Sequence, residues 1–348
     1  MSDVRTLSPL ERATYRLSQS LRAGWFGAQY ALSTRLSEPV AAPQHLRAAM
    51  PSAAALTADR RKLIERDLEN IEAGHYRLPH DLIESPAVAL RQSFAYFTDL
   101  AASSRRRRSD DVVPIDSERA AAFPDYYRHA FHNQTDGYLS ERSARLYDHQ
   151  VEVLFGGGAD AMRRQALVPL HGFLGERRIA ETSLIDIACG TGRFLTFVKD
   201  NYPRLPVTAL DISPYYLAEA RGNLQPWSRV SFVEAAIEAA ALPATSFDAA
   251  TCIFLFHELP IALHATAAAA IARLLAPGGL FVFIDSLQLG DRPDYDALLE
   301  YFPIAFHEPY FADYLRQDLA GCFAAAGLVL ERINLAYLSR VMVLRKPA

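Results

Sequence analysis

The sequence predicts an α/β fold in which a mostly parallel sheet follows an all-helical N-terminal part. After residue 180, short apolar runs alternate with helical patterns, which is typical of a parallel sheet with right-handed crossovers. The apolar runs cover 184–188, 207–210, 230–233, 249–254 and 280–284, and the helical patterns lie near 192–201, 214–224 and 260–276. Two further runs, 333–337 and 341–344, are joined tightly and predict an antiparallel edge.

The first hundred residues predict helices, and no alternating strand pattern precedes residue 112. Ser8 and Glu11 form a capping box with Pro9 at the first helical position. The apolar residues that follow at helical spacing are Leu10, Ala13, Leu17, Leu21 and Trp25. Further helices are expected from near Thr57 to Gly74, from Pro86 to about Ser103, from near Ser140 to Gly156–Gly158, and from Ala159 to about Phe173.

The best linker candidate is 101–116, which contains three serines, Arg105–Arg108 and Pro114. We interpret the arginine run as a solvated stretch behind a helix end, where cations suit the helix dipole, in preference to a contact with an anion or nucleic acid. The expected division is a helical N-terminal cap over 1–110 and a sheet domain over 111–348, with its core at 180–290.

Charge and cysteine usage exclude several classes of protein. The 348 residues carry a formal net charge of −4, and residues 116–348 hold 20 basic and 27 acidic side chains, which argues against nucleic acid as a partner. The three cysteines, Cys189, Cys252 and Cys322, have no CxxC spacing, so neither a disulfide framework nor a zinc site is expected. His129 and His132 have no third ligand at suitable spacing, and we expect no metal.

No apolar leader or stretch of about 18 apolar residues is present, so we expect a cytoplasmic protein without membrane contact.

A glycine turn, LIDIACGTGR over 184–193, joins the first expected strand to a helix. Gly190 and Gly192 let the backbone approach a ligand at the carboxyl end of the sheet. The dinucleotide fingerprint fails in both possible registers, because Leu195 stands at its third glycine position when it starts at Gly190, and Ala188 stands at its first when it starts two residues earlier; a Walker A lysine is also absent. Asp211 ends the next strand, where a carboxylate can accept hydrogen bonds from both hydroxyls of a ribose. The pattern favours a nucleoside-like cofactor.

Four segments in order, DIACGTG, ALDIS, SFDAATCIFLFHEL and LLAPGGLFVFIDS, resemble the class I S-adenosylmethionine-dependent methyltransferases. The resemblance covers about 180–290 and is to the small-molecule branch, which includes the ubiquinone/menaquinone-type enzymes. It implies a Rossmann-like seven-stranded sheet with the last strand antiparallel. It also implies S-adenosyl-L-methionine as cofactor, S-adenosyl-L-homocysteine as product, and 111–348 as the methyltransferase domain.

The resemblance also implies roles for individual residues. Asp186 and the turn of Ala188, Gly190 and Gly192 would hold the amino acid part of the cofactor. Asp211 would bind the ribose, Ile212 would pack on the adenine, and Phe254 would lie near the methionine part. The family's acidic residue for the adenine amino group aligns with Ala236, so backbone groups around Ile237, or Glu238, would take its place.

Three residues are catalytic candidates. His257 is the first choice as general base, since its ordinary pKa lies near neutrality, although a loop histidine bound to backbone is the plainer interpretation. Asp285 is expected to point towards the cleft, either to bind substrate or to cap a turn. Tyr138, with Tyr147 for the cofactor, is the preferred member of an aromatic group that could attract a sulfonium and keep the site dry. The residues of that group are Tyr126, Tyr127, His129, His132, Tyr138 and Tyr147.

We therefore expect a methyltransferase that acts on a small-molecule acceptor in a closed, aromatic-lined site. One rival is a thiol or sulfide S-methyltransferase, which a pocket too small for a ring system would favour. Two further rivals are a nucleic-acid methyltransferase and a non-methylating protein that binds S-adenosylmethionine. Segment 288–311 is expected near the substrate mouth, with His307 and Tyr310 as weaker contacts. Exposed faces of the N-terminal helices could pair two chains as a homodimer.

Overall fold

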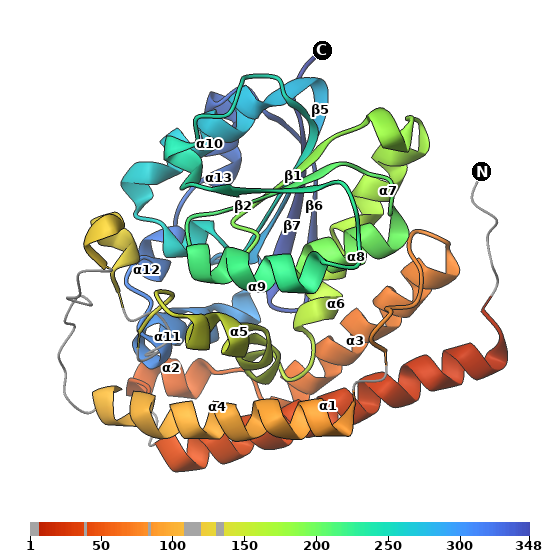
Figure 1. Ribbon diagram of the computed structural model, residues 1–348. Helices are drawn as coiled ribbons and strands as arrows, with labels where there is room; N and C mark the ends of the chain where they lie inside the picture. Colours follow the sequence, from red (N-terminus) through yellow and green to blue (C-terminus); the bar gives the residue numbers. More distant parts are fainter. Residues whose placement is uncertain (1–6, 38–39, 83–84, 108–119, 130–135) are drawn as a thin grey trace.

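A computed structural model describes residues 7–37, 40–82, 85–107, 120–129 and 136–348. Its centre is a seven-stranded sheet in the order β3-β2-β1-β4-β5-β7-β6 (Figure 1). The strands are β1 Leu184–Ile187, β2 Val207–Asp211, β3 Val230–Glu234, β4 Phe247–Ile253, β5 Leu275–Ser286, β6 Val329–Ala336 and β7 Ser339–Arg345. The first five are mutually parallel, and β7 is antiparallel to both of its neighbours, which confirms the predicted fold class.

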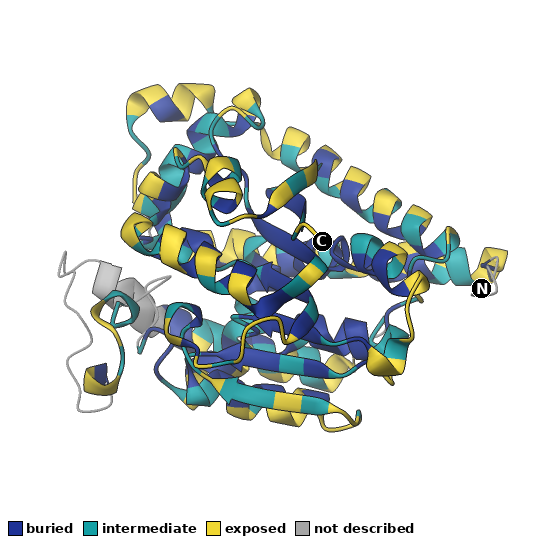
Figure 2. Ribbon diagram, turned by 90° about the horizontal axis from the view of Figure 1, so that it is seen from above, coloured by how far each residue is buried: buried dark blue, intermediate teal, exposed yellow. Residues whose placement is uncertain are grey.

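Helices cover both faces of the sheet. On one face, Leu195 and Leu217 pack with Val207 in a single core, whereas Ile271 and Phe323 belong to a second core on the other face. The helices that follow the sheet's first strand are α8 Arg193–Asn201, α9 Pro214–Leu224, α10 Ile261–Leu274, α11 Asp296–Phe306, α12 Phe311–Tyr314 and α13 Leu319–Ala325. The short 3₁₀ segments there are η5 Ile237–Ala239, η6 Phe256–Glu258 and η7 Pro293–Tyr295. In Figure 2 the inner strands of the sheet are largely dark blue, whereas the edge strands β3 and β6 are mostly half-buried or exposed.

The N-terminal helices form a layer below the sheet domain in Figure 1, where α1 and α4 run side by side. The helices before the sheet are α1 Pro9–Ser37, α2 Gln44–Ala49, α3 Ala53–Glu72, α4 Pro86–Arg107, α5 Glu141–Leu154, α6 Ala159–Arg164 and α7 Leu167–Gly175. Short 3₁₀ segments lie at η1 Ala120–Ala122, η2 Asp125–Tyr127 and η4 Ile179–Glu181. The capping box is present, since Glu11 N donates to Ser8 Oγ and Ser8 N donates to the Glu11 carboxylate.

The apolar stripe of α1 does not face the core. Leu10, Leu17 and Leu21 are 62–76% exposed, whereas Tyr15 and Phe26 on another side of the helix are buried. Helical spacing predicted the helix, but it could not tell which face would be covered.

Buried ion pairs join this layer to the sheet domain. Arg164 of α6 pairs with the fully buried Asp67 of α3 at 2.7 Å, and the Tyr15 and Tyr76 hydroxyls donate to the same carboxylate. Removing one partner of such a pair leaves an uncompensated buried charge. The helical layer is therefore integrated into the fold.

Several boundaries differ from the sequence prediction. The helix expected over 159–173 is split into α6 and α7 at Gln165 and Ala166, and α4 continues to Arg107, through most of the arginine run. Arg108 and His132 lie outside the described residues.

No helix in the described part of the chain is long and apolar enough to cross a membrane.

Candidate functional site

The glycine turn lies at the carboxyl end of β1 and contains three residues with left-handed backbone angles. Ala188, Gly190 and Gly192 have φ angles of 54°, 56° and 72°. Ala188 and Gly190 line a cavity, so this backbone faces open space. Glycine tolerates such angles without strain, whereas the non-glycine Ala188 is held there at a cost of about 1 kcal/mol or more. Strained backbone that lines a cavity is typical of a ligand site.

Asp211, at the end of β2, lies beside this turn. Its carboxylate accepts hydrogen bonds from Gly190 N and Ser213 N, both at 2.8 Å, and it lines the same cavity. Burial raises the pKa of Asp211 to about 6, although the backbone donors lower it in part. A carboxylate fixed in this way can still accept hydrogen bonds from ligand hydroxyls, because each oxygen carries two lone pairs.

Two residues expected at the cofactor do not line the cavity. Asp186 is buried and accepts a hydrogen bond from the Thr251 hydroxyl at 2.6 Å, and burial raises its pKa to about 7. Gly192 instead permits close packing, since a Cβ there would lie 2.9 Å from Leu224 Cδ1 and 3.2 Å from Ala220 Cβ on α9. Its part in the turn is therefore to let α8 approach α9.

The other end of the cavity is formed by the segment after β3. The lining residues there include the buried Ile237 and the half-buried Glu238, and Ile212 lines the cavity after β2. Glu238 Oε1 accepts a hydrogen bond from the Tyr126 hydroxyl at 2.5 Å, while its buried Oε2 has no hydrogen-bond partner. A buried acceptor of this kind can bind an amino group of a ligand.

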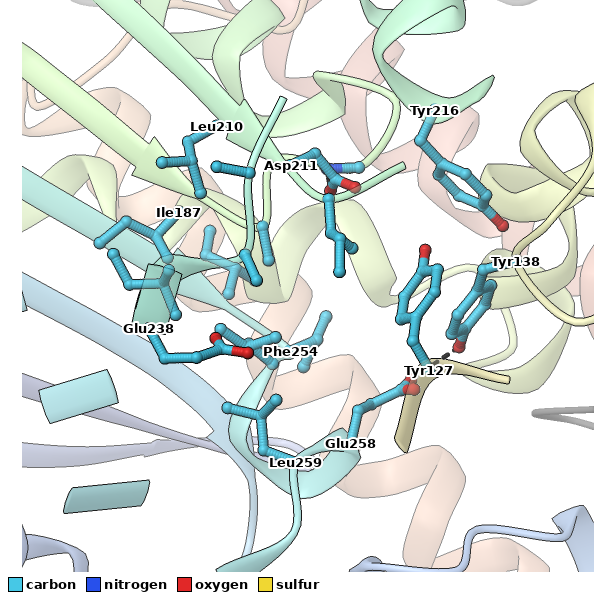
Figure 3. Close-up of a pocket in the computed structure, with 18 of the residues that line it drawn as sticks. Tyr127, Tyr138, Ile187, Leu210, Asp211, Tyr216, Glu238, Phe254, Glu258 and Leu259 are labelled. Carbon is cyan, nitrogen blue, oxygen red and sulfur yellow. Dashed lines mark hydrogen bonds between the residues drawn. The ribbon is translucent and has the colours of Figure 1, made fainter. Parts of the chain in front are cut away.

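Tyr127, Tyr138, Tyr147 and Tyr216 line the cavity, and Figure 3 shows Tyr127, Tyr138 and Tyr216 together on one side of it. Tyr138 lies edge-on to Tyr147 and Tyr216, with ring centroids 6.1 and 5.6 Å apart, and Tyr127 lies 6.0 Å from Tyr138. The Tyr138 hydroxyl donates to Glu258 Oε1 at 2.6 Å. Tyr216 was not identified from the sequence, because Ser213-Pro214-Tyr-Tyr reads only as a helix start.

His257 lies in η6, directly after β4, and is held by Asp285. Its Nδ1 lies 2.5 Å from Asp285 Oδ1, and its Nε2 lies 3.6 Å from Glu258 Oε1. Desolvation of the buried ring opposes protonation, but the Asp285 carboxylate outweighs it and raises the pKa of His257 above its ordinary value. With Nδ1–H donating to Asp285, the Nε2 lone pair is the free position of the neutral ring.

Asp285 itself does not point towards the cleft, which corrects the sequence expectation. It is fully buried at the end of β5, lines neither cavity described here, and also accepts hydrogen bonds from Phe256 N and Ser286 N. The end of a strand predicted its position along the chain but not its orientation. Its contacts make it a positioning residue for His257.

A second, larger cavity adjoins the first. It has a volume of about 360 Å³, and it shares Tyr147, Phe254 and Glu258 with the first cavity. Phe254 has a φ angle of 60° and stacks on Phe155 at 5.9 Å. The remaining wall is mostly apolar and comes from the N-terminal helices, α5, the segment after β5 and the last hairpin. Its residues are Gly27, Tyr30, Ala53, Leu56, Thr57, Arg60, Val151, Leu154, Phe155, Gly156, His257, Ser286, Leu298, Leu299, Phe302, Phe306, Phe311, Tyr337 and Leu338.

The structure brings part of segment 288–311 to this cavity, through α11 and Phe311, but not the two residues expected to contact substrate there. Tyr310 instead contacts His129, with its hydroxyl 3.0 Å from Nε2, and His307 lines neither cavity. The individual residues of α1 and α3 that line this cavity were not identified from the sequence, because residues so distant along the chain share no local pattern with the glycine turn. Among the described residues, His257, Glu258 and Glu308 place ligand atoms within 4.8 Å of one another.

Comparisons with known proteins agree on the sheet domain. Residues 184–279 match a family model described as a methyltransferase domain. The demethylmenaquinone methyltransferase of Thermus thermophilus is 33% identical over 133 residues, which are 38% of this chain and 57% of that protein. The ubiquinone/menaquinone biosynthesis C-methyltransferase of Methylobacterium nodulans is 32% identical over 160 residues, 45% of this chain and 61% of that protein. The chain thus spans about three fifths of the length of these relatives.

One similar solved structure is a Burkholderia thailandensis 1,6-didemethyltoxoflavin-N1-methyltransferase with bound 1,6-didemethyltoxoflavin and S-adenosylhomocysteine. It is 22% identical, covers 59% of this chain and 88% of that chain, and has a TM-score of 0.41.

Proposed function

We propose that residues 184–279, which match a methyltransferase domain, act as a class I S-adenosylmethionine-dependent methyltransferase of the small-molecule branch, and that the protein methylates an apolar small-molecule acceptor. The observation that carries the proposal is the meeting of two cavities at Phe254, Tyr147 and Glu258. One is suited to a nucleoside and the other to an apolar molecule of ring size. In such an arrangement, a methyl donor and an acceptor can meet at Phe254.

The first cavity fits S-adenosylmethionine by the chemistry of its acceptor atoms. Asp211 and Gly190 line this cavity side by side, and the Asp211 carboxylate would accept hydrogen bonds from the ribose hydroxyls. The partnerless Glu238 Oε2 suits the adenine amino group, and Ile212 and Ile237 suit the faces of the ring. The tyrosine wall suits the sulfonium end, since aromatic faces attract cations. When bound, the cofactor supplies an activated methyl group on sulfur.

The chain's own residues supply orientation, exclusion of water and a base. His257 lines the acceptor cavity, and its Nε2 would take a proton from an acceptor hydroxyl or amine. The imidazolium that forms is stabilised by Asp285 on one side and by Glu258 on the other. Tyr138 holds Glu258 in place through its hydroxyl.

The size of the second cavity helps to distinguish the proposed function from that of an S-methyltransferase that acts on small thiols. An apolar cavity of about 150 Å³ is enough to hold benzene. The volume here, about 360 Å³, has room for a ring system and favours a larger acceptor than a small thiol. The acidic balance of residues 116–348 and the apolar wall disfavour a nucleic acid.

The proposal is tested in two steps. Calorimetry with S-adenosylhomocysteine measures cofactor binding, and a screen with labelled methyl donor offers phenols, amines, carboxylates and thiols. We expect micromolar binding and transfer to a ring compound. Failure of S-adenosylhomocysteine to bind would refute the proposal. Binding without transfer to any acceptor would identify a non-methylating cofactor binder, and preferred transfer to small thiols would favour the S-methyltransferase.

A further inference from the structure

The wall of the second cavity contains one cationic side chain that its surroundings do not explain, Arg60 of α3. The residue is half-buried and lines this cavity but not the first. Its side chain forms no hydrogen bond or ion pair with any residue that the structure describes. Two other arginines pair with carboxylates of the same helix, since Arg292 binds Asp59 at 2.8 Å and Arg164 binds Asp67.

The Arg60 side chain lies across the turn made by Gly156–Gly158. A Cβ at position 156 would overlap the Arg60 guanidinium, and a Cβ at 158 would lie 3.5 Å from its Cγ. Gly156 itself lines the cavity. The absence of side chains at these positions therefore gives the guanidinium room beside the cavity.

A guanidinium that is partly withdrawn from water beside an apolar wall is stabilised when an anion pairs with it. The cavity offers no carboxylate near Arg60, since the acidic residue that lines it, Glu258, accepts a hydrogen bond from Tyr138 and borders the cofactor cavity. The partner of Arg60 is thus expected to arrive with the ligand. A guanidinium binds a carboxylate through two parallel hydrogen bonds.

Resting on the proposed function, we propose that the acceptor is an apolar ring compound that carries a carboxylate, and that Arg60 binds this carboxylate. The aromatic wall of Phe302, Phe306 and Phe311 holds the ring. A single cation suits a monoanion better than a phosphate, which carries nearly two charges and takes several donors. Arg60 is then a specificity residue, and His257 acts at the other functional end of the acceptor.

The test compares two ligands of equal ring size, 2-naphthoate and the neutral 2-naphthamide, by calorimetry with the S-adenosylhomocysteine-saturated protein. We expect the wild type to bind naphthoate about 10- to 100-fold more tightly than naphthamide, as is typical of a hydrogen bond to a charged group. Arg60→Gln should lose this preference and keep the affinity for naphthamide. Arg61→Gln is the matched control, because Arg61 is the exposed neighbour on the same helix.

The possible outcomes distinguish failure of the role of Arg60 from failure of the proposed function. Equal affinities for naphthoate and naphthamide, binding of neither, or a preference that survives Arg60→Gln would overturn the role of Arg60. Unchanged S-adenosylhomocysteine affinity of Arg60→Gln shows that the variant is folded. If S-adenosylhomocysteine does not bind the wild type, the proposed function fails, and the same titrations without it still test Arg60.

Discussion

His257 and Asp285 are buried together behind the acceptor cavity, and their contact has a consequence for pH dependence. Only the neutral imidazole can accept a proton. The negative charges of Asp285 and Glu258 raise the pKa of His257 by more than the desolvation of the ring lowers it. We therefore expect kcat/KM to rise with pH through a value above 6.5, the ordinary pKa of histidine. His257→Gln should lower the rate by about 10²- to 10⁴-fold.

Asp285→Asn separates positioning from packing. It removes the charge that raises the pKa of His257, so the rising limb should move to lower pH while the maximum rate falls. His171→Gln, whose ring contacts Tyr202 away from both cavities, should leave the profile unchanged. An Asp285→Asn profile identical to that of the wild type would exclude the positioning role.

Protonation of Asp211 should make cofactor affinity depend on pH, with weaker binding in acid. Its pKa is raised to about 6 by burial, so the carboxylate becomes protonated, and a poorer acceptor, as the pH falls below that value. Affinity for S-adenosylhomocysteine should therefore weaken below about pH 6. Asp211→Asn should weaken it about 10- to 100-fold at pH 7.5. Glu234→Gln, at the matching exposed end of β3, is the control, and equal losses in both variants would argue against ribose binding.

At the scale of elements, the turn from β1 into α8 is constrained by α9. Gly192→Ala adds a Cβ 2.9 Å from Leu224 Cδ1 at a φ angle of 72°. We expect a loss of about 1–3 kcal/mol in the free energy of unfolding, measured with urea. Gly222→Ala is the matched control inside α9, where a Cβ meets nothing within 4 Å, and it should stabilise by about 0.5–1 kcal/mol. A Gly192→Ala protein as stable as the wild type would show that α8 and α9 can separate without cost.

The bounds of the strands and helices show which features local sequence patterns predict and which they do not. All seven strands were predicted within a few residues, apart from the early start of β5 at Leu275, because apolar runs between turn residues depend on neighbouring residues alone. The break between α6 and α7 was missed, since 159–173 contains no proline or glycine at the break itself.

At the scale of the whole molecule, the helical layer depends on the buried charge of Asp67. Asp67→Ala leaves Arg164 buried without its partner, and we expect a loss of about 3–5 kcal/mol in the free energy of unfolding. Glu65→Ala, two residues earlier, breaks only the exposed pair with Arg16 and should cost about 1 kcal/mol or less. Similar unfolding midpoints for both variants would show that the layer contributes little to the stability of the fold.

The exposed leucines of α1 are the surface through which we expect two chains to form a homodimer. Leu17 and Leu21 are 62% and 65% exposed, and apolar side chains of this size are commonly covered at interfaces. Light scattering should find a dimer that Leu17→Glu or Leu21→Glu converts to a monomer without loss of folding. Val329→Glu, at an exposed position on β6, should leave the mass unchanged. A wild-type monomer at micromolar concentration would exclude this interface.

By itself, the sequence determined the order of strands and helices and the glycine turn with Asp211 after it. These features are local, because hydrophobic period, turn residues and strand ends are written in adjacent positions. The tertiary structure alone decided that Asp285 lies behind His257, that Glu238 has a partnerless oxygen in the cavity, and that α1 and α3 wall the second cavity. The residues that line the second cavity lie up to 311 positions apart, from Gly27 to Leu338, and packing free energy over the whole chain brings them together.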